Sequence, residues 1–376
     1  MRRAAFIYQE QLSRHVLRED HVLQPTRLQL TFELLQLYHA FDNAASKLAL
    51  PRPATDAELL TFHTREYVEA VKSFSRGERL QEQERFNFSD SGDNPVYEGI
   101  YEASALAAGA SLVAADLLAT GQAHVAFNVS GGMHHAAPGY ASGFCVFNDP
   151  ALAIHYFLKK GLRVAYVDID AHHGDGVQKA FYNRKEVLTI SLHETGMYLF
   201  PGTGDVTEIG TGEGLGYAVN LPLSPFTEDD TYLWAFDQVV PPLVKAFKPD
   251  VLVTQLGCDT HYLDPLTHIA LTTQGYTEVV RRLGQLAPGP GRWLALGGGG
   301  YEMGVVACCW ALAYGLMAGR DWPDAIPAEF QERYGLKRLH DQERPKIEAA
   351  WKERSRRFAE SSVEAVKRLV FPHHDP

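Results

Sequence analysis

Short apolar runs alternate with longer amphipathic runs through most of the chain. Five of the apolar runs are followed at once by a loop rich in glycine, histidine or aspartate, at residues 124–129, 164–169, 187–192, 251–256 and 293–296. Runs of helical length and apolar spacing lie between them, at 150–160, 229–247 and 272–286. This alternation predicts an α/β fold around a mostly parallel sheet. Because loops after the carboxyl ends of parallel strands gather at one edge, we expect the five loops to meet there.

Further helices are predicted outside this core. Residues 27–41 carry Leu28, Phe32 and Leu35 on one helical face, and residues 96–119 form a long alanine-rich run. Residues 303–318 are strongly apolar, but they are too short for a membrane span of about 20 residues and predict a buried helix. The remaining expectations are helices at 56–62 and 65–74, a surface loop over the polar stretch 75–94, and a single domain, 1–376, whose residues 321–376 form a C-terminal helical extension.

Composition narrows the class of protein. Apolar residues make up 45% and charged residues 22%, as in an ordinary globular protein. The net charge of −11 and the pI of about 5.8 speak against direct binding of nucleic acid and favour a cationic ligand. Four cysteines form neither a disulfide framework nor a CxxC zinc site, and the N-terminus lacks the apolar core of a signal peptide. We therefore expect a cytoplasmic protein with no membrane segment.

The stretch RVAYVDIDAHHGDGVQ, residues 163–178, carries the strongest chemical signal. Alternation along a strand brings Asp168, Asp170 and His172 to one face, and two carboxylates beside an imidazole imply a cation. Asp259, directly after another strand, is the expected third ligand of Asp170 and His172. Such a set leaves positions open, as in a catalytic site; zinc is the first choice, with Fe(II), Co(II) or Mn(II) as alternatives. The structural alternative is a strand that ends in a polar turn.

Two other loops supply candidate proton and oxyanion chemistry. His134 and His135 follow two glycines and are suited to acid–base work, with Asp168 and Asp175 as carboxylate partners that orient the rings. Tyr301 follows four glycines without the lysine of a phosphate loop, so we expect a mobile or tightly turned segment that delivers a phenol to an oxyanion. The structural alternatives are a surface histidine pair and a core tyrosine.

With these residues the chain resembles the zinc-dependent histone deacetylase superfamily, most closely its bacterial acetoin-utilisation members. The motifs SGGMHHAAPGYASGFCVFND, DIDAHHGDGVQ, GCDTHYLDP and LGGGGYE carry the resemblance, in family order. It implies an arginase/deacetylase-like fold, with helices on both faces of the sheet. The implied zinc ligands are Asp170, His172 and Asp259, with His134 and His135 as the histidine pair.

The resemblance also implies roles for residues around the metal. By this resemblance, Tyr301 polarises the acetyl carbonyl, and an acyl-lysine tunnel is lined by Gly143, Phe144 and Phe200. Asp93 holds the substrate backbone, and Arg27 belongs to an internal acetate channel. A structural potassium ion is bound through residues 168–172, Ser191 and Leu192. The chain departs from the family pattern at three positions. Met133 replaces the tryptophan of many eukaryotic members, Leu199 replaces a residue that is often aromatic, and Cys258 replaces the usual alanine.

The expected activity is hydrolysis of N-acetyl-lysine amides in proteins, releasing acetate. Acetylated metabolic enzymes such as acetyl-CoA synthetase are the partners that the resemblance suggests, and acetylpolyamines are the alternative substrates. Two other readings are an arginase-like ureohydrolase with two manganese ions and an acyl-lysine binding module without catalysis. The sequence indicates no particular oligomeric state.

Overall fold

The computed structural model describes residues 3–78, 83–289 and 291–374. Its core is an eight-stranded sheet in the order β2-β1-β3-β8-β7-β4-β5-β6, and every pair of neighbouring strands is parallel. The carboxyl ends of all the strands therefore lie at one edge. The strands are β1 (Ala4–Ile7), β2 (Ser46–Ala49), β3 (Val125–Asn128), β4 (Val164–Asp168), β5 (Val187–Glu194), β6 (Ala218–Leu223), β7 (Val251–Gln255) and β8 (Trp293–Leu296).

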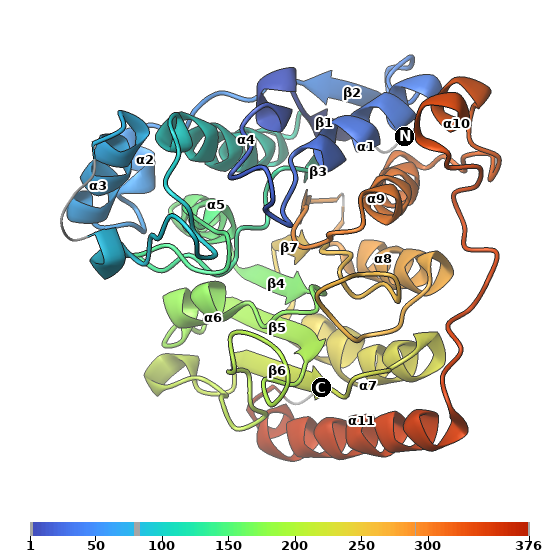
Figure 1. The fold of residues 1–376 in the computed structure, drawn as a ribbon. Helices are drawn as coiled ribbons and strands as arrows, with labels where there is room; N and C mark the ends of the chain where they lie inside the picture. The colour runs from blue at the N-terminus through green and yellow to red at the C-terminus, as the bar shows by residue number, and fades with distance from the viewer. Residues whose placement is uncertain (1–2, 79–82, 290, 375–376) are drawn as a thin grey trace.

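Helices cover both faces of the sheet (Figure 1). Apolar side chains of α1, α7, α8 and α9 pack on one face, and those of α4, α5 and α6 pack on the other. The last long helix, α11, lies against β6 and α7 at the sheet's edge. The helices are α1 (Thr26–Leu37), α2 (Asp56–Leu59), α3 (Arg65–Ser75), α4 (Ile100–Ala119), α5 (Asp149–Leu158), α6 (Asp175–Phe181), α7 (Asp229–Phe247), α8 (Thr273–Leu286), α9 (Met303–Ala318), α10 (Ala328–Tyr334) and α11 (Ala349–Leu369).

Burial on both faces explains the sequence pattern of the central strands. All residues of β4, β5, β7 and β8 are buried. Strands β4, β7 and β8 accordingly read as runs that are apolar over most of their length, whereas β5 alternates apolar residues with Thr189, Ser191 and His193. The predicted buried helix at 303–318 is α9, which is apolar all round because neighbours enclose it. Among the described helices, α4 has the length and composition of a membrane span, but it packs against α3, α5 and β3 as a core helix does.

The polar stretch 75–94 differs from the predicted surface loop. Within its described part, Phe86 and Phe88 are buried in a cluster with Tyr67 and Phe74 of α3, while residues 79–82 lie outside the described part. The abundant charges of the stretch obscured these two aromatic anchors. The described part of the stretch is thus packed against α3 through these two rings, and most of its other residues are exposed or half-buried.

Candidate active site

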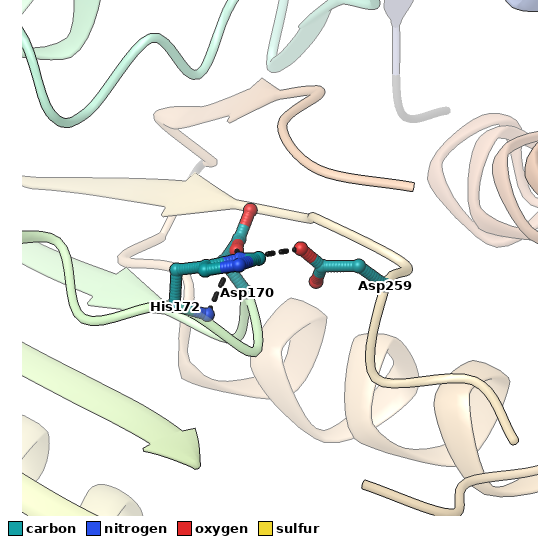
Figure 2. Close-up of side chains that lie close together, drawn as sticks. All are labelled: Asp170, His172 and Asp259. Atoms are coloured by element: carbon teal, nitrogen blue, oxygen red, sulfur yellow. Dashed lines mark hydrogen bonds and ion pairs between the residues drawn. The ribbon is translucent and has the colours of Figure 1, made fainter. Parts of the chain in front are cut away.

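A buried cluster of three metal-capable side chains lies at the carboxyl edge of the sheet. Asp170 and His172 come from the loop after β4, and Asp259 comes from the loop after the neighbouring strand β7 (Figure 2). The candidate ligand atoms lie within 4.8 Å of one another. The His172 Nδ1 atom is 3.1 Å from Asp170 Oδ1 and 2.9 Å from Asp259 Oδ2. The structure therefore brings together the three ligands predicted from sequence.

Hydrogen bonds fix the two carboxylates so that one oxygen of each faces His172. Asp170 Oδ2 accepts hydrogen bonds from Gln255 Nε2 at 2.6 Å and from the Gly299 amide at 2.7 Å. Asp259 Oδ1 accepts one from the Ala171 amide at 2.8 Å. Such outer partners orient ligands and tune their basicity. Gln255, at the end of β7, was missed from sequence, although a polar residue closing a buried strand was a signal that could have identified it.

The charges of the cluster fit a divalent cation. Burial and the adjacent Asp170 carboxylate raise the pKa of Asp259, because two carboxylates so close together resist being charged at once. A cation between them removes that repulsion. Two carboxylate oxygens and one imidazole nitrogen suit zinc and other first-row divalent ions, and three protein ligands leave room for water or substrate.

The glycine run 297–300 is a close-packed wall of this cluster. A Cβ atom on Gly299 would lie 2.1 Å from Asp259 Oδ2, and one on Gly298 would lie 2.1 Å from Gln255 Nε2. Gly298 and Gly300 also have φ angles of 136° and 135°, which side chains disfavour. Of the two explanations offered by the sequence, a mobile or a tightly turned segment, the geometry supports the second.

His134 and His135 face each other beside the cluster, and each ring has its own carboxylate. His134 Nδ1 is 2.8 Å from Asp168 Oδ2, and His135 Nδ1 is 2.8 Å from Asp175 Oδ1. The two Nε2 atoms are 3.0 Å apart. Both rings are buried, so the pair is not the surface pair that was the structural alternative.

The two imidazoles differ in their affinity for a proton. Burial opposes the charged form of His134, but the carboxylates of Asp168 and Asp170 outweigh it and raise its pKa to about 9. Burial and the adjacent charge of His134 lower the pKa of His135 to about 3, despite its hydrogen bond to Asp175. These opposite shifts favour the proton on His134 over the proton on His135.

Buried polar residues that sequence reasoning missed hold the backbone around the histidine pair. Asn148 donates to the carbonyl oxygens of His134 and Ala136 at 3.2 and 2.9 Å. The neighbouring Asp149 accepts from the amides of Gly132 and Met133 at 3.1 and 2.8 Å. The FND sequence at 147–149 was quoted only as part of a motif, and its polar residues at a helix start were the available signal.

Aromatic residues surround the entrance to the site. The Phe200 ring is 5.0 Å from the ring of His135, and the Phe144 ring is 5.9 Å from the ring of Tyr301. A Cβ on Gly143 would lie 2.4 Å from the His135 ring, so this position admits no side chain without a shift. A small pocket of about 20 Å³ is lined by Leu23, Arg27, residues 132–135, residues 143–145, Asp170, His172, Gly298, Gly299 and Tyr301.

The remaining predicted residues lie at different distances from this pocket. Arg27 is buried and donates from Nη1 to the carbonyl oxygens of Gly298 and Gly300 at 2.7 and 3.0 Å. Asp93 is exposed and does not line the pocket. The adjacent Asn94 is buried instead, and its Oδ1 atom accepts a hydrogen bond from the Phe144 backbone amide at 3.0 Å. For the predicted potassium site, Ser191 pairs with Asp168 between β5 and β4, and Leu192 is buried.

A parallel sheet with an Asp–His–Asp cluster at its carboxyl edge defines the arginase/deacetylase-like class of α/β proteins. The histone deacetylase domain model matches residues 21–317. The chain belongs to the histone deacetylase family, as its sequence motifs indicated.

Similar proteins support this assignment along most of the chain. The acetoin utilization protein AcuC of Bacillus subtilis is 43% identical over 334 residues, covering 88% of this chain and 86% of the relative. AcuC of Staphylococcus aureus is 40% identical and covers 82% and 80%. The crystal structure of an HDAC homolog from Aquifex aeolicus matches with a TM-score of 0.87 and 30% identity, over 97% of this chain and all of that one. The chain is thus a deacetylase-family hydrolase, and family membership favours this class over the ureohydrolase alternative.

Proposed function

We propose that this protein is a metal-dependent lysine deacetylase that acts on acetylated proteins or peptides. The observation that carries the proposal is that Asp170 and His172 of the Asp–His–Asp cluster line the same pocket as the histidine pair and Tyr301. A deacetylase needs an activated water, a proton acceptor and a donor to the oxyanion, and these groups supply all three.

Asp170, His172 and Asp259 would hold a divalent metal ion, with zinc favoured by the donor set and Fe(II) or Co(II) also accommodated. When bound there, the ion would supply Lewis acidity, which polarises a carbonyl and lowers the pKa of water to about 7. His135 accepts the proton of the attacking water at Nε2 and returns it to the leaving amine. His134 supports the pair electrostatically, Asp168 and Asp175 orient the rings, and Tyr301 donates its hydroxyl hydrogen to the oxyanion.

Gly143, Phe144 and Phe200 would form the walls around the acyl-lysine stem, and Asp93 would contact the substrate backbone outside the pocket. Potassium bound near Asp168, Ser191 and Leu192 would be structural. The exposed fractions of Met197, Tyr198 and Phe200 are 75%, 54% and 45%. These exposed apolar side chains, of which Phe200 contacts His135, favour a polypeptide over a small acetylpolyamine, because a large partner can cover them. Acetyl-CoA synthetase in the cytoplasm is the partner that we propose.

Acetate release by the zinc-loaded protein tests the proposal. An acetyl-lysine peptide should be hydrolysed with a higher kcat/KM than N-acetylputrescine. Binding of the peptide without acetate release would instead support the non-catalytic binding module. Preference for N-acetylputrescine would move the assignment to small-molecule amidohydrolases.

A further inference from the structure

Another pocket lies at the same edge of the sheet as the catalytic pocket, and we call it the aromatic pocket. Its volume is about 240 Å³, against about 20 Å³ for the catalytic pocket. Its wall comes from the loops after β5, β6 and β7 and from the first turns of α11. Because these loops follow the carboxyl ends of parallel strands, a large partner at the catalytic pocket would approach the molecule from the side on which the aromatic pocket lies.

Three aromatic rings form much of this wall, those of Tyr198, Phe226 and Trp351. The centres of the Phe226 and Trp351 rings are 5.2 Å apart. Phe226 has a φ of 65°, which residues other than glycine rarely adopt, and its amide donates to the His268 carbonyl oxygen at 2.7 Å. Tyr198 and Trp351 are exposed to solvent. The rings thus form a fixed apolar surface that a partner could cover.

The charge of the wall is opposite in sign to that of the whole protein. The described residues that line it include Arg354 and His268 but no carboxylate, whereas the chain carries a net charge of −11. On the same helix, Lys352 pairs with Glu228 at 2.8 Å. The Arg354 guanidinium carbon lies 5.2 Å from the Trp351 ring centre, and no carboxylate in the described part of the chain pairs with it. A carboxylate that entered the pocket could therefore pair with Arg354 without displacing another.

The aromatic pocket is close enough to the catalytic pocket for one polypeptide to reach both. Tyr198 lines the aromatic pocket, and the ring of Phe200, two positions later, is 5.0 Å from the ring of His135 in the catalytic pocket. Two residues of extended chain span about 7 Å at most. A polypeptide whose acetyl-lysine enters the catalytic pocket would thus bring residues roughly three to six positions away over the aromatic pocket.

We propose that the aromatic pocket is a docking site on the enzyme for its polypeptide substrate. It binds a bulky apolar side chain that has an acidic neighbour and lies a few positions from the acetyl-lysine. The inference rests on the proposed function and names the class of polypeptide that the enzyme selects. The rings bury the apolar side chain, and Arg354 pairs with the neighbouring carboxylate. A small acetylated amine reaches only the catalytic pocket, so it gains nothing from this site.

The test uses acetyl-lysine peptides of one length in a Gly-Ser background, with the zinc-loaded full chain. Each peptide carries a phenylalanine–glutamate pair at one spacing, roughly three to six residues before or after the acetyl-lysine. The reference peptide carries Gly-Ser at every such position. We expect one spacing to raise kcat/KM about tenfold over the reference, because a buried phenylalanine ring adds binding energy that the reference lacks. The gain should appear as a lower KM with kcat unchanged.

Two variants connect this preference to the pocket. Trp351→Ala should remove most of the gain and leave kcat/KM for the reference peptide within about twofold. Tyr334→Ala is its control, because the two side chains are exposed to 39% and 38% and Tyr334 lies outside the pocket. Arg354→Glu should abolish the gain from glutamate and favour a phenylalanine–lysine pair instead, an exchange that a purely structural role would not produce. Arg357→Glu, on the same helix and outside the wall, is the control for charge.

A kcat/KM that stays within about twofold across the whole peptide set would overturn the docking site and leave the deacetylase intact. A preference that persists in both Trp351→Ala and Arg354→Glu would also overturn it. Hydrolysis of no peptide by the wild type would reject the proposed function itself. The affinities of the same peptides for the same proteins, measured by fluorescence anisotropy, would then decide on the docking site separately, by the same order of preference.

Discussion

The Nε2 atoms of His134 and His135 lie 3.0 Å apart, although each ring is bound at Nδ1 by a different carboxylate. A hydrogen bond between the two Nε2 atoms needs one of them to carry the proton and the other to accept it. The raised pKa of His134 and the lowered pKa of His135 identify His134 as the donor. In the proposed mechanism, a proton accepted by His135 would lie beside the charge on His134, which would favour its release to the leaving amine.

Asp175→Asn should lower kcat about 10²- to 10⁴-fold while metal content stays the same. An amide can donate to His135 Nδ1, which would move the ring proton to Nε2 and remove the acceptor. The matched control is Lys179→Gln, which removes a half-exposed partner 2.7 Å from Asp175 and keeps the carboxylate. Comparable losses in the two variants would show that the charge around Asp175, and not the tautomer of His135, controls the rate.

Tyr301→Phe should keep the metal and lose roughly 10²- to 10³-fold in kcat, because it deletes one donor to the oxyanion. Its KM should change little. Zinc content and steady-state kinetics measure the two effects separately, and Tyr262→Phe on another loop of the same edge serves as the control. Full turnover of zinc-loaded Tyr301→Phe would remove Tyr301 from the mechanism.

Asp259→Ala should lose both metal and activity, because it deletes one of three ligands. Gln255→Ala keeps all three ligands but removes the 2.6 Å hydrogen bond to Asp170, and should weaken metal affinity by about 10- to 100-fold. Competition with a chromophoric chelator measures both constants. An unchanged affinity in Gln255→Ala would show that the Gly299 amide alone orients Asp170.

Acidification should destabilise the protein partly through His63, outside the metal cluster. Burial lowers the pKa of His63 to about 3, although backbone hydrogen bonds favour its charged form. In the unfolded chain this imidazole binds its proton near pH 6.5. As the pH decreases below that value, this residue therefore lowers the free energy of unfolding by about 1.4 kcal/mol for each pH unit.

Urea unfolding at several pH values between 7 and 5 checks this, with His63→Gln as the comparison. The variant should be less stable at pH 7, because it disturbs the hydrogen bonds to Ala137 and Asn148. Its free energy of unfolding should, however, decrease less steeply as the pH is lowered. Parallel curves for the two proteins would show that His63 is already charged in the fold.

The central part of the fold was predictable because most of its strands are buried on both sides and begin as apolar runs. The edge strands were harder to recognise. β2 is short and half exposed, and β6 contains Asn220 and Pro222, residues that a sequence reading assigns to turns. Pro222 is compatible with β6 because β6 is the last strand of the sheet, where one side needs no ladder partner.

The candidate site was predictable where chemistry requires rare residues in dense clusters, as at Asp170, His172 and the histidine pair. The residues that support it were not. Gln255, Asn148 and Asp149 act through contacts with other loops, and their local signals, the end of a buried strand and the start of a helix, do not say which loop each residue contacts. Asp93 and its neighbour Asn94 illustrate the same limit, since only the fold decides which of two adjacent side chains turns inward.

An all-parallel sheet also determines where the molecule tolerates additions. Since the candidate active-site loops follow the carboxyl ends of strands, the turns that precede the strands lie at the opposite edge. Gly161, in the turn before β4, has a φ of 74° and no atom within 4 Å of the space where a side chain would begin. A fluorescent tag or an immobilisation peptide inserted there would leave the entrance to the pocket open, so the enzyme could be anchored to a surface with its substrate side facing solution.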